Sequence, residues 1–405
     1  MKLDLFKDDF MAVEWIWLVF IFAFGACIGS FLNVVIYRLP RDKSLVSPPS
    51  ACPGCDTPIR FYNNIPLFSW LILRGKCPDC KARISCRYFF VELFTAVLFG
   101  GLYLCFFWFR YRQTGLAGST AMQQFFGGGW LFYLVIATLF ASFLAASVID
   151  MELWIIPLEL CWFVTVAGLI VSGVAGFVID SGIIAEFDLF PAVSGCPRFA
   201  ALTAGSAIGL GISLILLFAG IIKPSYEMVA DKEGDCEEAV KSQENEPEFE
   251  DRKEILKEII FLLPVVIGAF VALKVTQMPF LQDKWGSFIA MPAIFGLMGS
   301  LGGYLAGAAI VWAIRIFGTL GFNKEAMGLG DVHLMGAAGA VIGAKWVVLA
   351  FFIAPFLGIL WALYQAIFKK MRQIPYGPFL SLAVFVVIIF HDWIDRILLN
   401  YYGVS

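Results

Sequence analysis

Long apolar stretches recur along almost the whole of this 405-residue chain, and they limit its possible folds more than any other feature. A stretch of about 20 apolar residues can cross a bilayer as a helix. A further stretch, 332–343, is apolar but only about half that length. The pattern predicts an all-α polytopic membrane protein with eight or nine transmembrane helices and one partial helix. The expected crossings are 15–37, 88–109, 128–149, 154–180, 199–222, 258–275, 287–317, 345–368 and 379–398.

The charged residues are too few for a soluble protein of this size. They make up 15% of the chain, against about 25% in soluble domains. The net charge of -3 gives no basic surface for nucleic acid, so membrane lipid is the expected environment. Because no small-residue cleavage site follows the first apolar run, we expect it to be a retained helix rather than a signal peptide.

The loop 38–87 orients the chain. It carries nine basic and three acidic residues, and cytosolic loops of membrane proteins are enriched in Lys and Arg. Counting crossings from this loop places the 149/154 junction, the stretch 318–331 and the basic loop 369–372 in the cytosol as well. The loop 369–372 falls in the cytosol, as its basic residues predict, only if 332–343 does not cross the membrane fully. Arg110 and Arg112 would then face outside, which counts against the scheme.

Residues 223–257 differ in kind from the rest of the chain. They hold twelve acidic and six basic residues and few apolar ones, so they cannot bury enough surface to fold alone. We expect a flexible acidic cytosolic insertion. It divides the chain into an N-terminal segment with the first helix (1–37), a cysteine-containing loop (38–87), helices 88–222, the insertion, and helices 258–405.

Four of the ten cysteines form two matched pairs within the cytosolic loop. Two residues separate the cysteines of each pair, so both sulfurs can reach one ion. Four thiolates suit a closed, tetrahedral zinc site with a structural role, and the sequence predicts a small zinc knuckle here. Redox-active or loose surface thiols remain alternatives. The pairs are Cys52-Pro-Gly-Cys55 and Cys77-Pro-Asp-Cys80.

Two aspartates lie at the cytosolic ends of expected crossings. Asp150 ends one apolar run, and Asp331 closes Gly328-Leu-Gly-Asp331 just before the partial helix. Convergent carboxylates can divide acid and base roles in hydrolysis. A lone aspartate at a crossing's end is more often an interfacial cap, so the residues alone leave both readings open. The competing carboxylates are Glu92, Glu152, Glu159, Asp392 and Asp395.

With only two histidines, His333 and His391, a histidine metal site is not expected. His333 follows Asp331 by two residues and is a candidate to orient or neutralise it.

Five motifs together resemble the type IV prepilin peptidases, the leader peptidase/N-methyltransferase family. The resemblance covers most of the chain, and the motifs stand in the family's order. They are Gly29-Ser-Phe-Leu-Asn-Val-Val-Ile-Tyr-Arg-Leu-Pro40, the paired cysteines around Asn64–Gly75, Asp150 with Ile156-Pro157, Gly328-Leu-Gly-Asp331, and Ile374-Pro-Tyr-Gly-Pro-Phe379.

The resemblance implies an aspartic endopeptidase of the bacterial cytoplasmic (inner) membrane, with Asp150 and Asp331 as the catalytic pair. Its substrates would be type IV prepilins or pseudopilins, of pili or type II secretion, cleaved after a basic leader. It would also methylate the new N-terminal residue with S-adenosylmethionine. Leu158 and His333 stand where the family usually has Asp and Lys.

Three other functions remain open at this point. A cleavage-only peptidase would make mature pilin without the methyl group. An ion-coupled transporter would use Asp150 and Asp331 as ion ligands near the bilayer middle. A zinc-stabilised scaffold would tolerate the loss of both aspartates.

Overall fold

The computed structural model describes residues 2–52, 54–108, 129–178, 196–222, 251–322, 325–368 and 375–402. Within these ranges the regular elements are helices, accompanied by two isolated β-bridges. The chain divides into two compact units. The first comprises Met1–Val171, Glu186–Leu189 and Phe352–Ser405, and the second Ser172–Ala185 and Phe190–Phe351. Arg110 and Arg112 lie outside the described residues, as do the loop 369–372 and most of the acidic insertion.

Eight helices of the described chain are long and apolar enough to cross a membrane. The all-α, multi-pass prediction is therefore confirmed. The expected crossing 379–398 lies in a helix whose apolar part, Gly377–His391, is shorter than the others. The eight candidates are Trp15–Arg41, Cys86–Phe107, Gly129–Leu153, Leu158–Ala175, Pro197–Phe218, Glu254–Thr276, Pro292–Phe322 and Leu329–Leu363.

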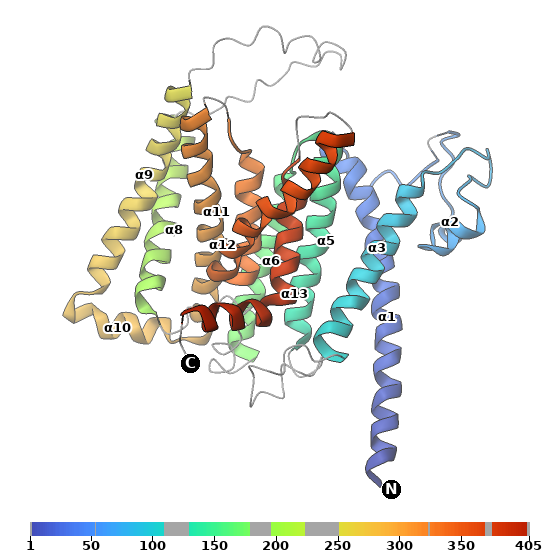
Figure 1. The fold of residues 1–405 in the computed structure, drawn as a ribbon, viewed down its shortest axis with the longest axis horizontal. Coiled ribbons are helices and arrows are strands. Elements are labelled where there is room, and N and C mark those ends of the chain that lie inside the picture. The colour runs from blue at the N-terminus through green and yellow to red at the C-terminus, as the bar shows by residue number, and fades with distance from the viewer. Residues whose placement is uncertain are drawn as a thin grey trace. The chain divides into compact units, whose positions relative to one another are not determined.

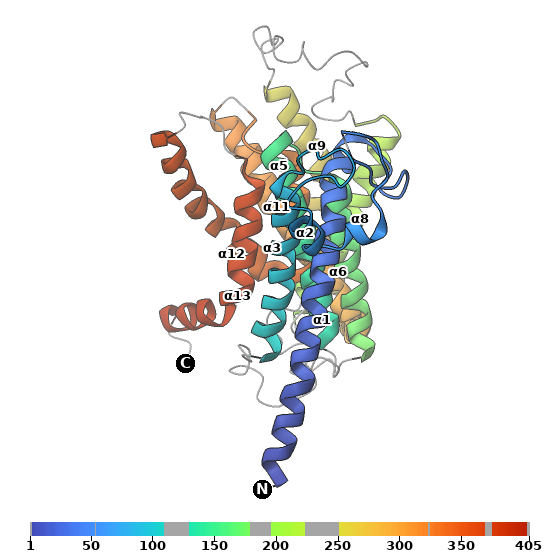
Figure 2. The ribbon, with the colours of Figure 1, turned by 90° about the vertical axis from the view of Figure 1, so that its right-hand side faces the viewer.

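The first unit is built around α1, which runs beside α3, as Figures 1 and 2 both show. Asn33 on α1 donates its side-chain amide to the carbonyl of Tyr88 across 3.1 Å. Small residues on α1, including Gly25 and Gly29, lie against the backbone of α3 and allow the close approach common between membrane helices. The unit contains α1 (Lys2–Arg38), η1 (Leu39–Arg41), η2 (Phe61–Asn64), α2 (Phe68–Ile72), α3 (Cys86–Tyr103), the π-helical turn η3 (Leu104–Trp108), α5 (Gly129–Leu153), most of α6 (Leu158–Val178) and α13 (Gly377–Tyr402).

The second unit packs α8 closely on α9, and α11 on both. The α11 helix also contacts the start of α12, where Ser300 donates its hydroxyl to the carbonyl of Ala340 across 2.7 Å. The unit contains α8 (Pro197–Phe218), α9 (Asp251–Thr276), α10 (Pro279–Ile289), α11 (Pro292–Phe322) and residues 329–351 of α12 (Leu329–Phe368). The remainder of α12 belongs to the first unit.

A break at Gly343 divides α12 into two helical segments. Its φ of 82° and ψ of 170° lie outside helical geometry and in a region that glycine adopts at little cost. The segment before the break, 329–342, is too short to span a bilayer, at about 1.5 Å of rise per residue. This confirms the partial helix predicted after Asp331.

The structure differs from the predictions in two places, a helix start and an additional short helix. The α9 helix begins at Asp251, so the last seven residues assigned to the flexible insertion 223–257 are helical. An ion pair between Lys257 and Glu254, one helical turn apart, and the burial of Ile255 favour helix there. The short helix α10 was not expected, because its polar Gln282, Asp283 and Lys284 interrupt the apolar pattern.

Candidate active site and metal centre

Asp150 lies in the last turn of α5 and is buried, with 6% of its surface exposed. One of its carboxylate oxygens, Oδ2, accepts a hydrogen bond from the backbone N–H of Gly377 across 3.0 Å. Gly377 is the first residue of α13 and belongs to the motif that ends at Phe379. The proline-glycine motif, which carried no assigned role in the sequence, therefore supplies a backbone donor to this carboxylate.

Close packing explains why residue 377 is glycine. A Cβ atom built there would lie 2.7 Å from Asp150 Oδ2 and 3.2 Å from Ile156 Cδ1. One turn before Asp150, the hydroxyl of Ser147 donates to that of Ser381 on α13 across 3.0 Å. The two contacts fix the register of α5 against α13, and hence the position of the Asp150 carboxylate.

Asp331 lies in the first turn of α12 and is buried, with 8% exposed. The glycines at 328 and 330 flank the start of the helix, at Leu329. His333 shares a hydrogen bond between its Nδ1 atom and the hydroxyl of Tyr304 on α11, at 3.1 Å. Tyr304 on the neighbouring helix is thus a contact of His333 that the sequence did not indicate.

Asp150 belongs to the first unit and Asp331 to the second. Each lies near the helix end where the sequence analysis places it, and their pairing stays a prediction.

Two of the competing carboxylates of the first unit, Glu92 and Glu152, have other contacts. Glu152 forms an ion pair with Arg87, and both side chains are partly exposed. Glu92 accepts the backbone N–H of Leu67 across 2.8 Å, which ties the motif 64–75 to α3. Glu159 is exposed near the start of α6. These contacts account for Glu92 and Glu152 as structural residues.

The four paired cysteines converge. The sulfur atoms of Cys52, Cys55, Cys77 and Cys80 all lie within 4.8 Å of one another, and Cys52 and Cys80 approach to 3.7 Å. A zinc ion with Zn–S bonds of about 2.3 Å holds its sulfurs roughly 3.8 Å apart, so the cluster fits such an ion.

Both cysteine pairs sit in turns of the same construction. An isolated antiparallel bridge closes each turn, Ala51 with Pro58 and Lys76 with Arg83. The residue after each second cysteine, Asp56 or Lys81, has a positive φ and donates its N–H to the carbonyl of the first cysteine. Repetition of the turn brings four sulfurs to one point.

The cluster's charge also suits a cation. Hydrogen bonds from Thr57 lower the pKa of Cys55 to about 7, and those from the backbone of Cys80 and Asp79 lower the pKa of Cys77. Although Ala82 donates a backbone hydrogen bond to Cys80, the neighbouring cysteine side chains raise its pKa to about 12. Adjacent thiolates repel one another, and a bound divalent cation offsets this repulsion.

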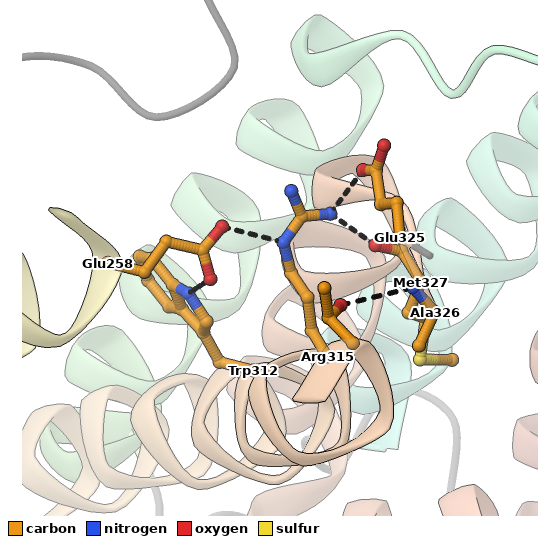
Figure 3. Close-up of polar contacts among 7 residues, drawn as sticks. Glu258, Trp312, Arg315, Glu325, Ala326 and Met327 are labelled. Atoms are coloured by element: carbon orange, nitrogen blue, oxygen red, sulfur yellow. Dashed lines mark hydrogen bonds and ion pairs between the residues drawn. The ribbon is translucent and has the colours of Figure 1, made fainter. Parts of the chain in front are cut away.

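A charged cluster in the second unit was missed. Arg315 on α11 is buried between Glu258 of α9 and Glu325, which precedes the Gly328–Asp331 motif (Figure 3). The available signal was a single arginine in the apolar run 287–317, since charges inside membrane crossings are rare and usually functional.

Two family models match the chain. Residues 23–106 match the bacterial peptidase A24 N-terminal domain, and residues 251–363 match the type IV leader peptidase family. Over residues 251–363 the chain is therefore similar to the type IV leader peptidase family. The first match contains the four cysteines and the second contains Asp331, whereas Asp150 lies outside both.

Curated relatives point the same way. A prepilin leader peptidase/N-methyltransferase of Myxococcus xanthus is 41% identical over 158 residues, which cover 39% of each chain. One of Aeromonas hydrophila is 33% identical over 192 residues, covering 41% of this chain and 58% of the relative. A type 4 prepilin-like proteins leader peptide-processing enzyme of Escherichia coli is 40% identical over 146 residues, covering 32% of this chain and 46% of the relative. No solved structure matches.

Proposed function

We propose that this chain is a membrane aspartic endopeptidase that removes the basic leader of type IV prepilins or pseudopilins. The proposed place of cleavage is the cytosolic face of the bacterial inner membrane. The observation that carries the proposal is the match of residues 251–363, with Asp331 among them, to the type IV leader peptidase family. The matched stretches span about two fifths to three fifths of the length of the three relatives named above.

Asp150 and Asp331 are the proposed catalytic residues. One carboxylate takes a proton from a water molecule as its oxygen attacks the scissile carbonyl. The other, protonated, donates to the developing oxyanion. The tetrahedral intermediate then collapses, the C–N bond breaks, and the leaving amine takes up a proton. The Gly377 N–H holds Asp150 in place and supports its role in this scheme.

The proposed substrate has two parts that meet at the membrane border. Its apolar helix would lie against the membrane-spanning helices, and its basic leader would stay in the cytosol. Exposed aromatic residues on the helices, such as Phe94 and Phe163, offer apolar contact area for lipid or substrate.

The four-cysteine cluster is proposed to bind a structural zinc ion through Cys52, Cys55, Cys77 and Cys80. The ion would hold the two turns together, since its four positions are filled by sulfur and none is left for substrate. Cys52 and Cys77 are buried, Cys55 is partly buried and Cys80 is exposed, so the proposed centre lies at the surface of the loop.

N-methylation of the new N-terminus is a further part of the proposal, supported by the names of the relatives from Myxococcus and Aeromonas. S-adenosylmethionine would supply the methyl group. The names of the matching family and relatives describe peptidases and methyltransferases, and they do not support ion-coupled transport.

Incubation of the purified protein with a prepilin tests the proposal, with the product mass as the readout. We expect loss of the leader, and a further methyl group only when S-adenosylmethionine is present. Asp150→Asn and Asp331→Asn should each abolish cleavage while the protein stays folded. Cleavage without methylation would identify a cleavage-only peptidase. Wild-type cleavage rates in either variant would overturn the catalytic assignment.

A further inference from the structure

Arg315 is a charged residue where the bilayer penalises charge. It lies in the candidate crossing Pro292–Phe322, and its side chain is only 3% exposed. A buried charge is tolerated when it is paired and its hydrogen-bonding groups are satisfied. The contacts of this arginine therefore indicate what it holds.

On one side the guanidinium is anchored to α9. Its Nε atom donates to Glu258 Oε1 across 2.8 Å, and Glu258 is equally buried. Trp312, one turn earlier on α11, donates its indole N–H to the other oxygen of Glu258 across 3.0 Å. Both oxygens of Glu258 are thus engaged, and the orientation of Arg315 is fixed by a neighbouring helix.

On the other side Arg315 holds the segment that leads to Asp331. Its Nη1 atom donates to Glu325 Oε1 across 2.6 Å and also to the carbonyl of Met327. Between these contacts, the backbone N–H of Ala326 donates to the hydroxyl of Thr319 on α11 across 3.2 Å. Three successive residues are therefore tied to α11 (Figure 3).

The tied segment is followed at once by Gly328-Leu-Gly-Asp331. Two glycines in four residues allow many backbone conformations, so a fixed anchor directly before them limits where α12 starts. We propose that Arg315, Glu258 and Glu325 form a loop clamp that positions the Asp331 carboxylate for the reaction. The inference rests on the proposed function, and the three are positioning residues, not catalytic ones.

The alternative is that the Arg315–Glu258 pair only joins α9 to α11. Substitution of Glu325 distinguishes this alternative from the clamp. Its side chain is 45% exposed, and such a partner adds little to global stability. Its loss should loosen the loop, which then keeps only the contacts of Ala326 and Met327, while the buried Arg315–Glu258 pair remains. Glu325→Gln keeps an oxygen that can accept from Arg315, so it is the conservative variant.

The test compares Glu325→Ala and Glu325→Gln with wild type. Glu254→Ala serves as the matched control, because it removes a 2.6 Å ion pair with Lys257 on the same α9 helix as Glu258. The readouts are kcat and KM for prepilin cleavage, and hydrogen exchange of the amides of residues 328–332.

For Glu325→Ala we expect kcat to fall about tenfold with KM within about twofold, since small misplacements of reacting groups are costly. Exchange of the amides should rise by about tenfold. Glu325→Gln should recover most of both values, and Glu254→Ala should change neither.

Unchanged exchange in Glu325→Ala would overturn the clamp. Raised exchange with wild-type kcat would overturn the positioning of Asp331. If the wild-type protein cleaves no prepilin, the proposed function fails, and exchange alone still decides whether the clamp orders the loop.

Discussion

The backbone N–H of Gly377 and the carboxylate of Asp150 meet at 3.0 Å although 227 positions separate them in the sequence. The contact joins two of the five motifs and places one proposed catalytic residue against the start of α13. The contact requires a backbone N–H donor and no side chain at residue 377, and the second requirement can be tested by substitution.

Gly377→Ala should reduce prepilin cleavage by about a hundredfold, because its Cβ atom would lie 2.7 Å from Asp150 Oδ2 and push the carboxylate aside. The cleavage rate and the melting temperature of the purified variant measure this. Gly101→Ala is the matched control, since a Cβ atom there meets nothing within 4 Å. Wild-type activity of Gly377→Ala would remove Gly377 from the site.

Glu152→Gln should cleave prepilin at close to the wild-type rate, in contrast to Asp150→Asn. The Arg87–Glu152 pair is partly exposed, and such pairs contribute at most about 1 kcal/mol. Cleavage rates of the two variants, measured together, decide which acid at this junction acts in catalysis. Loss of activity in Glu152→Gln alone would reverse the assignment.

Ser147→Ala should lower the free energy of unfolding by about 1 kcal/mol through loss of the hydrogen bond to Ser381. Denaturant unfolding of Ser147→Ala, Ser381→Ala and the double variant measures it. Since both residues serve one bond, the double variant should be little worse than either single one. Additive losses would show that the bond contributes nothing.

Purified protein should contain about one zinc ion per chain, and Cys80→Ser should lose most of it. Elemental analysis measures the metal. Cys86→Ser, at an exposed cysteine outside the cluster, should retain it. Equal metal content in the two variants would contradict a site at the four cysteines.

Zinc retention should also depend on pH. The pKa of Cys55 is lowered to about 7 from an ordinary value of 9.0 by hydrogen bonds from Thr57. A lowered pKa keeps the thiolate available at neutral pH, and that advantage disappears as pH falls through about 7. Because protons compete with zinc for the thiolates, zinc release, followed with a chromophoric chelator, should rise as the pH falls below about 7. Release independent of pH would count against thiolate ligands.

The sequence predicted those features that depend on neighbouring residues. Hydropathy located the crossings because each is a continuous apolar run, and the half-length run 332–343 indicated the break that the structure places at Gly343. The convergence of the four cysteine sulfurs was predicted from the spacing within each pair. The Arg315–Glu258 pair and the Gly377–Asp150 contact join residues far apart in the chain, and no local pattern encodes them.

The small space at residue 377 has a genetic consequence. The nearest atoms to a Cβ there belong to the side chains of Asp150 and Ile156. Shortening Ile156 would relieve only the milder contact, and Asp150 cannot be exchanged if it is catalytic. A selection for restored pilin processing in a Gly377→Ala strain should therefore return true revertants to glycine rather than second-site suppressors.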